Sequence, residues 1–207
     1  MLISTKGRIG MQVEIRRLSP AVASDYIAFF DERAFSDGSI NKGCYCVWHH
    51  WTDQHELARS MLPEGERPDR KRAYAAELIG QGKLNGFLAY SGGRVVGFCN
   101  ADLKDHYFRL QMEAAPATWK NLSVGDRVLA IVCFVVAPDM RGQGVATALL
   151  QAACRYAEEN GYDYVESYPT AGGFRTSDCC GPASMYEKAG FEIIEIPDGV
   201  LARKRCR

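Results

Sequence analysis

The sequence predicts a mixed α/β domain with a central, mostly antiparallel sheet flanked by helices. Three patterns carry this prediction. Residues 87–100 and residues 191–205 each hold two short apolar segments separated by turn-forming residues, which is typical of β-hairpins. Residues 129–168 combine an apolar strand, a helix with an apolar face and a second strand. Such a combination indicates helices packed against one sheet.

Length and composition favour a single folded domain. The chain has 207 residues, of which 47% are hydrophobic and 24% are charged. One core commonly grows to this size, so a single domain is the simplest organisation. Because Met11 opens the first strand-like segment, we expect residues 1–10 to be a disordered extension or the remains of an upstream start. Residues 11–207 are expected to form the domain.

The charge balance argues against polyanionic partners. Lysine plus arginine and aspartate plus glutamate number 25 each, so no overall field draws the protein to nucleic acid or an anionic membrane. The longest apolar run, residues 129–136, is far shorter than the roughly 20 residues that span a bilayer. Residues 1–10 lack a signal-like apolar stretch. We therefore expect a cytoplasmic protein with no nucleic acid partner and no membrane partner.

The first half of the chain predicts three strands and two helices. Residues 13–18 alternate apolar and charged side chains, as a half-buried strand does, and Ser19 and Pro20 then favour the start of a helix. The other expected elements are a helix over residues 20–30, a loop with short helical turns over residues 36–51, a helix over residues 69–81, and hairpin strands over residues 87–90 and 94–100.

The second half predicts a long connection followed by six elements. Residues 102–126 are long for a connection in a compact domain, which is typical of a binding loop or lid. The expected elements are a strand buried on both faces over residues 129–136, a helix over 144–159, a strand over 164–168, a helix over 182–189, and strands over 191–196 and 200–205. Every fourth residue of the long helix predicts one packing face: Val145, Leu149, Ala153 and Ala157.

The segment between the apolar strand and the long helix carries the chemistry. It reads Arg141-Gly142-Gln143-Gly144-Val145-Ala146. The two glycines let the backbone come close to a bulky anion, while a helix start offers unpaired N–H groups and the positive end of its dipole. Together these features predict a pyrophosphate site.

Two other glycine loops fit this segment poorly. The phosphate loop of nucleoside triphosphatases needs Gly-Lys-Ser/Thr, and no such tripeptide follows Gly144. The dinucleotide-binding fingerprint needs a third Gly or Ala where Thr147 stands, and it normally lies in the first strand-helix unit of a chain. Neither alternative is favoured.

The same residues resemble a known family. Arg141-Gly142-Gln143-Gly144-Val145-Ala146 matches the Gln/Arg-x-x-Gly-x-Gly/Ala signature of the GCN5-related N-acetyltransferases (GNAT). Tyr186-Glu187-Lys188-Ala189-Gly190-Phe191 is similar to the family's Tyr-x-x-x-Gly-Phe segment. The resemblance covers residues 13–205 in element order, with its specific motifs between residues 132 and 191. It implies the GNAT-like fold, whose central sheet is splayed where the donor enters.

The resemblance implies a transferase that moves an acetyl group, or a longer acyl group, from acetyl-CoA to an amine. It implies that the backbone at Val135 and Val136, near a bulge in the central strand, binds the pantetheine arm and polarises the thioester carbonyl. The pyrophosphate would be held by Arg141, Gly142, Gln143, Gly144, Val145 and Ala146. The implied partners are acetyl-CoA and an amine-bearing acceptor, and a homodimer is compatible with the resemblance.

Tyr186 is the expected catalytic acid. A tyrosine hydroxyl with an unperturbed pKa of about 10 is protonated at neutral pH and can donate its proton as the leaving sulfur gains charge. Aromatic packing is the simpler explanation of a lone tyrosine, but the position of Tyr186 before Gly190 and Phe191 favours the catalytic role. The amine is expected to attack directly, without a covalent enzyme intermediate.

No general base is assigned. Many members of the resembling family use a glutamate on or beside the central strand, whereas residues 129–136 contain no carboxylate. Four titratable side chains lie in expected loops, where each is individually better explained as a surface or structural group: His49, His50, Asp105 and His106.

The chain has eight cysteines. Three of them lie inside predicted strands or helices and are expected to be reduced core residues: Cys99, Cys133 and Cys154. A second group has the residue types of a zinc site: Cys44, Cys46, His49, His50, Cys179 and Cys180. Its Cys-x-Cys spacing is tighter than that of the usual structural zinc pair, so we expect no metal and prefer buried thiols or a pocket lining. A redox-sensitive thiol pair is a further alternative.

The acceptor groove is expected between the loops at residues 36–51 and 102–126. Five aromatic side chains there either contact substrate or cover the edge of the core: Tyr45, Trp48, Trp51, Tyr107 and Phe108. Two other functions stay open. One is a noncatalytic sensor that binds acyl-CoA, suggested by the missing strand carboxylate. The other is a zinc-binding interaction module, suggested only by the cysteine and histidine cluster.

Overall fold

A computed structural model of the chain describes residues 3–6, 12–112, 124–169, 179–196 and 199–206. One sheet of eight strands runs through it in the order β1-β2-β3-β4-β5-β6-β8-β7. The strands are β1 (Ile3–Lys6), β2 (Gln12–Arg17), β3 (Gly86–Ser91), β4 (Arg94–Leu103), β5 (Val128–Val136), β6 (Tyr164–Ser167), β7 (Glu192–Ile196) and β8 (Gly199–Arg205). Among these described strands, only β5 and β6 pair in parallel. The predicted mixed fold with a mostly antiparallel sheet is confirmed.

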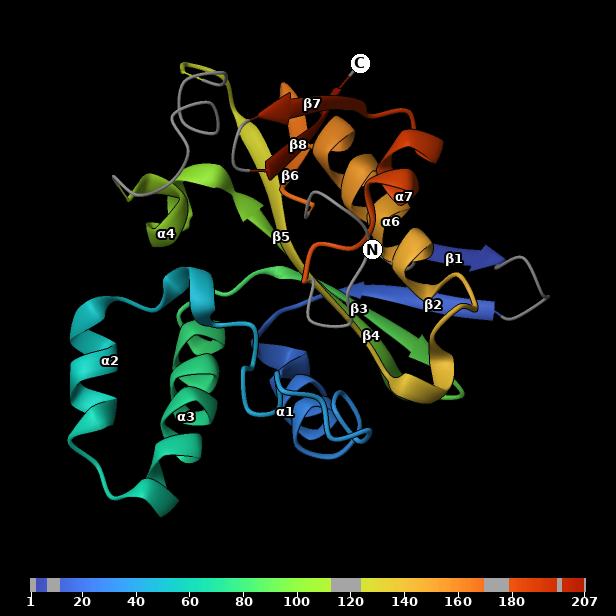
Figure 1. The fold of residues 1–207 in the computed structure, drawn as a ribbon. Helices are drawn as coiled ribbons and strands as arrows, with labels where there is room; N and C mark the ends of the chain where they lie inside the picture. Colours follow the sequence, from blue (N-terminus) through green and yellow to red (C-terminus); the bar gives the residue numbers. More distant parts are fainter. Residues whose placement is uncertain (1–2, 7–11, 113–123, 170–178, 197–198, 207) are drawn as a thin grey trace.

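Helices cover both faces of this sheet (Figure 1). They are α1 (Ala23–Glu32), α2 (Asp53–Ser60), α3 (Arg67–Gly80), α4 (Phe108–Gln111), α6 (Val145–Glu159) and α7 (Ala183–Lys188). Short 3-10 turns lie at Pro20–Val22, Trp48–His50, Glu64–Glu66, Lys104–His106 and Pro138–Met140. In Figure 1, β5 runs through the middle of the molecule, with β1 to β4 on one side and β6 to β8 on the other.

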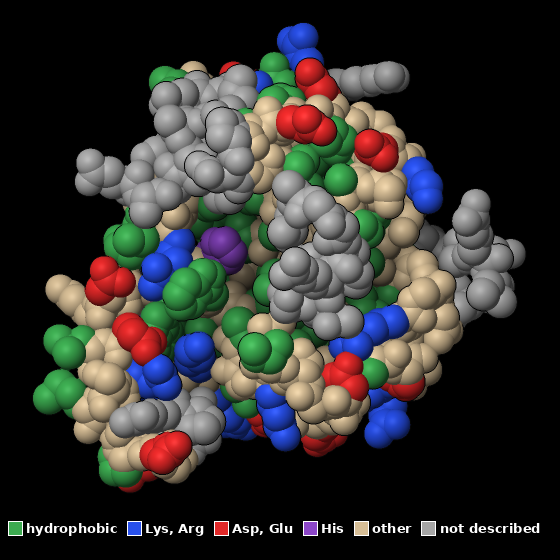
Figure 2. Space-filling view, in the orientation of Figure 1, with side chains coloured by type: hydrophobic (Ala, Val, Ile, Leu, Met, Phe, Trp, Pro, Cys, Tyr) green, Lys and Arg blue, Asp and Glu red, His purple; other side chains and the backbone are tan. Residues whose placement is uncertain are grey.

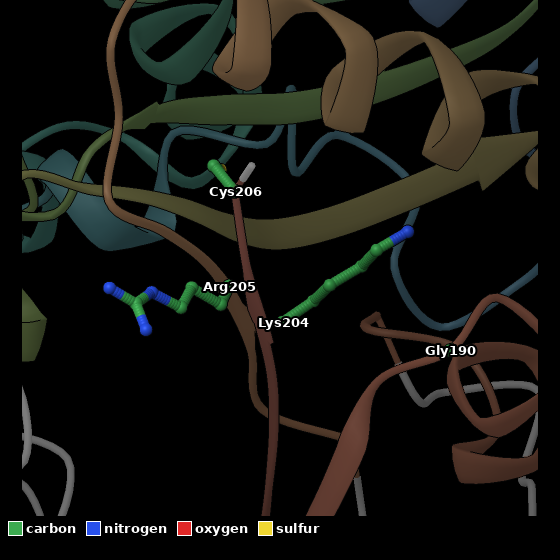
Figure 3. Close-up of a pocket in the computed structure, with 4 residues that line it drawn as sticks. All are labelled: Gly190, Lys204, Arg205 and Cys206. Atoms are coloured by element: carbon green, nitrogen blue, oxygen red, sulfur yellow. The ribbon is translucent and has the colours of Figure 1, made fainter.

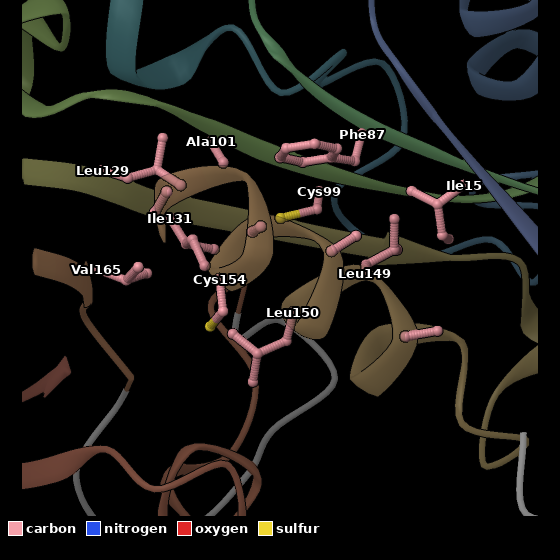
Figure 4. Close-up of a cluster of buried hydrophobic side chains, with 14 of the residues drawn as sticks. Ile15, Phe87, Cys99, Ala101, Leu129, Ile131, Leu149, Leu150, Cys154 and Val165 are labelled. Carbon is pink, nitrogen blue, oxygen red and sulfur yellow. The ribbon is translucent and has the colours of Figure 1, made fainter. Parts of the chain in front are cut away.

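The alternation of side chains along β3 separates two hydrophobic cores. Phe87 and Ala89 pack in the core beneath α6, which is drawn in Figure 4. Leu88 and Tyr90 point the other way, into the core that α1 and α3 cover. The predicted face of the long helix is also confirmed, because its four residues are all buried: Val145, Leu149, Ala153 and Ala157.

A bulge and a parting of strands interrupt the centre of the sheet. Between β4 and β5 the register shifts after Asn100, so that Val132 is an extra residue on β5. The pairing of β5 with β6 ends at Ile131 and Ser167. β6 itself ends at Ser167, which leaves the edge of β5 from Val132 to Val136 without a partner strand in the described part of the chain.

Two segments differ from the sequence-based expectations. Residues 3–6 form β1 and pair with β2, although residues 1–10 were expected to be a disordered extension; the other six lie outside the described residues. The pairing adds a strand to an edge, which local sequence does not reveal. Helix α2 was not predicted because Leu57 is its only large apolar side chain and none of its residues is buried. Thr52 caps it, with His55 completing a capping box.

The structure also bears on the membrane prediction. Over the described ranges, the helices are too short or too polar for any of them to cross a lipid bilayer.

Gly97 lies on β4 directly beneath α6. A Cβ atom at this position would be 2.8 Å from Cγ1 of Val145 and 3.2 Å from the carbonyl oxygen of Val135. Overpacking of this kind costs about 1–3 kcal/mol, so we predict that Gly97→Ala lowers the melting temperature by several degrees in a thermal unfolding scan. Gly80→Ala is the matched control, since a Cβ there meets no atom within 4 Å. Equal melting temperatures for the two variants would contradict this packing.

Candidate active site

The turn between β5 and α6 is built for a close approach to its backbone. Gly142 has a φ of 74° and Gly144, the N-cap of α6, has a φ of 87°, which are values that favour glycine. A Cβ at Gly142 would meet no atom within 4 Å, so the space beside it is open. The backbone N–H groups from Gly142 to Thr147 have no hydrogen-bond partner among the described residues. With the positive end of the helix dipole, they form a cradle for an anion.

Side chains hold this turn in place. Nη1 of Arg141 donates to Oδ2 of Asp37 at 2.6 Å, and its Nε donates to the carbonyl oxygen of Val136 at 3.2 Å. The hydrogen bond from Arg141 lowers the pKa of the Asp37 carboxyl group. Gln143 donates through Nε2 to the carbonyl oxygen of Asp139 at 2.8 Å. The side chains of Arg141 and Gln143 thus hold the turn in its conformation, while its backbone N–H groups remain available to bind a ligand.

The open edge of β5 presents main-chain groups beside this turn. Hydrogen-bonding groups along an antiparallel strand point alternately to its two sides, so those of Val135 face Phe98 on β4. Those of Phe134 and Val136 face the open edge. The N–H of Phe134 donates to the carbonyl oxygen of Cys179 at 2.5 Å. Val135 and Val136 were the two residues expected to bind the pantetheine arm. Val136 directs its main-chain groups to the open edge, whereas Val135 directs its own to β4, and Phe134 takes its place at the edge.

Tyr186 on α7 reaches the point where β5 and β6 part. Its side chain is fully buried, and its hydroxyl donates to the carbonyl oxygen of Cys180 at 2.5 Å. The same hydroxyl lies 2.7 Å from Oγ of Ser167, which in turn donates to the carbonyl oxygen of Ile131 at 2.8 Å. Burial raises the pKa of Tyr186 well above its ordinary value, so the hydroxyl keeps its proton at neutral pH.

A cavity of about 310 Å³ opens beside the bulge of β5. Its walls come from the loop at residues 40–49, from Lys71 on α3, from Val132 and Cys133 on β5, and from Cys179. Figure 2 shows a histidine recessed among hydrophobic side chains on this face, with lysine or arginine side chains beside it. The cavity thus reaches the strand edge that carries Phe134.

Another cavity, of about 570 Å³, lies at the far end of the sheet. Gly190, Lys204, Arg205 and Cys206 line it, and Figure 3 shows the Lys204 and Arg205 side chains pointing to opposite sides of β8. None of the predicted site residues lines this cavity, so it is not the candidate site.

Four cysteines meet at the cavity beside β5: Cys44, Cys46, Cys133 and Cys179. The sulfur atoms of Cys46 and Cys133 are 2.9 Å apart, and burial raises the pKa of the Cys46 thiol to about 11. Among the described residues, no group of three or more His, Cys, Asp or Glu side chains is arranged to hold a metal ion. The predicted core thiols Cys99, Cys133 and Cys154 are all buried and free.

Of the four titratable groups considered as bases, only His49 lines this cavity. Its Nδ1 is buried without a hydrogen-bond partner in the described structure, and burial lowers the His49 pKa to about 4. His50 packs against the ring of Tyr107 at 5.1 Å between centroids, and burial lowers its pKa to about 4 as well. His106 contacts Asp102 through Nδ1 at 3.0 Å. Asp105 is exposed. His49 is therefore neutral at pH 7 and faces the cavity.

Sequence reasoning missed three contacts of this site: the Phe134 N–H on the open edge, the Asp37 partner of Arg141, and the Ser167 partner of Tyr186. The alternation of main-chain hydrogen-bonding groups along β5, counted from the bulge, could have indicated that the Phe134 N–H faces the open edge. The other two join residues that are far apart in the sequence, and no local pattern marks them.

Comparison with known proteins gives the class of this chain. The sequence matches the family model described as the acetyltransferase (GNAT) family over residues 47–191, which is more than half of the chain. The chain belongs to this family, as its glycine turn and its Tyr186 segment predicted. No curated protein matches the sequence.

Solved structures share the fold. An acetyltransferase of the GNAT family from Listeria monocytogenes is 13% identical, with a TM-score of 0.59, and the match covers 98% of this chain and 99% of that one. The GNAT domain of S. lividans PAT is 16% identical, with a TM-score of 0.58 and coverage of 99% and 96%. The Drosophila melanogaster polyamine N acetyltransferase is 12% identical, with a TM-score of 0.51 and coverage of 92% and 97%.

The thiols around the cavity should differ sharply in reactivity. Cys179 is exposed, whereas Cys46 is buried and has a raised pKa, which lowers its thiolate fraction at neutral pH. We predict that iodoacetamide labels Cys179 first in the native protein and labels Cys46 only after unfolding, as measured by peptide mass spectrometry. A Cys179→Ser variant should lose the fast-reacting site. Equal labelling rates for Cys46 and Cys179 would contradict the burial of Cys46 and the raised pKa of its thiol.

Proposed function

We propose that the protein transfers an acetyl group, or another small acyl group, from acetyl-CoA to the amine of a small acceptor. One observation carries the proposal: the unpaired N–H groups at the start of α6 lie beside the strand edge at which β5 and β6 part. The first feature suits the pyrophosphate of coenzyme A, and the second suits its extended arm. Membership of the GNAT acetyltransferase family supports the same reaction class.

The turn and the strand edge would bind different parts of acetyl-CoA. The pyrophosphate would accept hydrogen bonds from the backbone N–H groups of Gly142, Gln143, Gly144, Val145 and Ala146. The N–H of Arg141, the sixth residue predicted to hold it, already donates to the carbonyl oxygen of Pro138 at 3.5 Å, so Arg141 would act by holding the turn through its side chain. The pantetheine arm would lie along Phe134 and Val136, where it would replace the carbonyl oxygen of Cys179 as partner of the Phe134 N–H. The Phe134 N–H already points away from β4. Binding would therefore require the Cys179 carbonyl to move away, while β5 keeps its conformation.

The reaction would proceed in one displacement. The neutral amine attacks the thioester carbonyl, so that a C–N bond forms and the C–S bond breaks. A main-chain N–H on the open edge of β5 stabilises the developing oxyanion, and Tyr186 gives its proton to the departing sulfur. The amine loses a proton to solvent or to an acceptor in the cavity.

Gly142→Ala tests the anion cradle. A methyl group would project into the open space beside the turn and push the pyrophosphate away from one or two N–H groups. Hydrogen bonds to a charged group contribute about 1.5–3 kcal/mol each, so we predict at least about a tenfold loss of coenzyme A affinity by calorimetry.

Gly92→Ala is the matched control for that experiment. Gly92 has a φ of 56° and equally open surroundings, but it lies in the hairpin turn between β3 and β4. The control should bind coenzyme A as the parent does. An equal loss in both variants would mean that backbone strain, and not a lost contact, explains the effect.

Tyr186→Phe tests the acid. The variant keeps the ring but has no proton to donate, so we predict a fall in kcat of about 10²–10⁴ with an unchanged Kd for coenzyme A. Because burial raises the pKa of Tyr186, the parent should lose no activity through this group up to about pH 10. Tyr162→Phe, a buried tyrosine outside the site, is the control. Full turnover in Tyr186→Phe would remove the residue from the mechanism.

The noncatalytic sensor remains the second candidate, because β5 carries no carboxylate. Coenzyme A binding without thiol release across a broad panel of amines would favour the sensor over the enzyme.

A further inference from the structure

The described residues that line the cavity beside β5 carry positive charge. Lys42 and Lys71 line it from the loop and from α3, and neither aspartate nor glutamate is among its described lining residues. Neither lysine lies within 4.0 Å of a carboxylate oxygen among the described residues. Two cationic side chains therefore line the cavity without an ion-pair partner from the described part of the protein, and the Lys71 ammonium lies 5.8 Å from the centroid of the Trp51 ring.

The field inside the cavity has the same sign. Burial is the main cause of the raised pKa of Cys44, and Lys71 acts against it by favouring the thiolate. Burial is also the main cause of the lowered pKa of His49, and the permanent positive charge of Arg109 lowers it further. The Arg109 guanidinium stacks on the ring of Trp48, another wall residue, at 3.8 Å. A cation in this cavity would meet like charge.

Nearby carboxylates are engaged elsewhere. Glu56 feels the charge of Lys71, but it is bound by Arg59 and accepts a hydrogen bond from Nε1 of Trp51 at 3.0 Å. The hydrogen bond from Arg59 is the main reason that the Glu56 pKa falls to about 2. Asp53 lies 3.8 Å from Arg109 and is largely exposed. These groups do not cancel the charge that faces the cavity.

We infer that the acceptor is a small primary amine that also carries an anionic group, such as a carboxylate or a phosphonate. The inference rests on the proposed acyl transfer and narrows its substrate class. Lys42 and Lys71 pair with the anionic group, while the amine lies toward His49 and the edge of β5. A volume of about 310 Å³ is at the small end of ligand sites, which fits an acceptor of amino acid size.

The same charges favour the reactive form of the amine. A protonated amine would be repelled by the lysines, so the cavity lowers the pKa of the bound ammonium and favours its neutral, nucleophilic form. A polyamine, which holds several positive charges, would instead need carboxylates on the wall. The charge of the cavity walls thus favours anionic amines over polyamines, a distinction that the fold alone does not make.

Four amines that each contain three carbon atoms test this inference: β-alanine, aminopropylphosphonate, propanolamine and diaminopropane. Each is assayed with acetyl-CoA by free-thiol release and by mass spectrometry of the acetylated product. We expect kcat/KM to be at least about tenfold higher for the two anionic amines than for propanolamine, and lowest for diaminopropane. Comparison of β-alanine with aminopropylphosphonate shows whether the lysines prefer a carboxylate or a phosphonate. Equal rates, or a preference for diaminopropane, would overturn the inference.

Lys71→Gln is the matched variant. It should raise KM about tenfold for the anionic amines and by a smaller factor for propanolamine, and it should leave coenzyme A affinity intact by calorimetry. Lys83→Gln, on the exposed surface after α3, is the control and should change none of these values. An unchanged KM for β-alanine in Lys71→Gln would remove this lysine from acceptor binding.

Calorimetry separates this inference from the proposed function. Each amine is titrated into the protein, alone and saturated with coenzyme A. Binding of the anionic amines without thiol release would support the charge of the cavity and contradict the enzyme. Thiol release without a preference for anionic amines would support the enzyme and contradict the inference. Absence of binding by either anionic amine would also overturn the inference.

Discussion

β5 and β6 pair over only four residues, from Val128 to Ile131, and this short ladder determines how the rest of the site is arranged. A parallel pair that stops in the middle of a sheet leaves main-chain donors and acceptors on the continuing strand. The bulge at Val132 re-aims β5 at the same place. Beyond it, Phe134 and Val136 direct their hydrogen-bonding groups away from β4, where a further extended chain can use them.

Each remaining part of the site is held relative to this opening. Helix α6 packs across β2 to β6, which fixes its first turn and the N–H groups of Gly142 and Gly144 beside the end of β5. Ser167, the last residue of β6, sets the Tyr186 hydroxyl at the branch point. The cavity with its lysines and thiols lies against the bulge itself. Unpaired N–H groups, an open strand edge, a buried tyrosine hydroxyl and a small cavity thus meet along one strand.

The sequence predicted the parts of this site that local chemistry determines. The two glycines before a helix, the apolar period of α6 and the hairpins are local patterns, and the structure reproduces them. Contacts between distant segments could not be read in this way. The pairing of Arg141 with Asp37 joins residues 104 positions apart, and the approach of Cys46 to Cys133 joins residues 87 apart. The charge of the cavity likewise depends on which loop packs against α3.

The most direct test is nuclear magnetic resonance of the backbone amides during titration with coenzyme A. The account predicts that the amide signals of Gly142, Gly144 and Phe134 shift together and saturate at one ligand per chain, because these N–H groups would exchange solvent or the Cys179 carbonyl for the ligand. The amide of Gly92, in the remote hairpin turn, should stay in place. Saturable binding that leaves the three site amides unmoved, or no binding at all, would contradict the account.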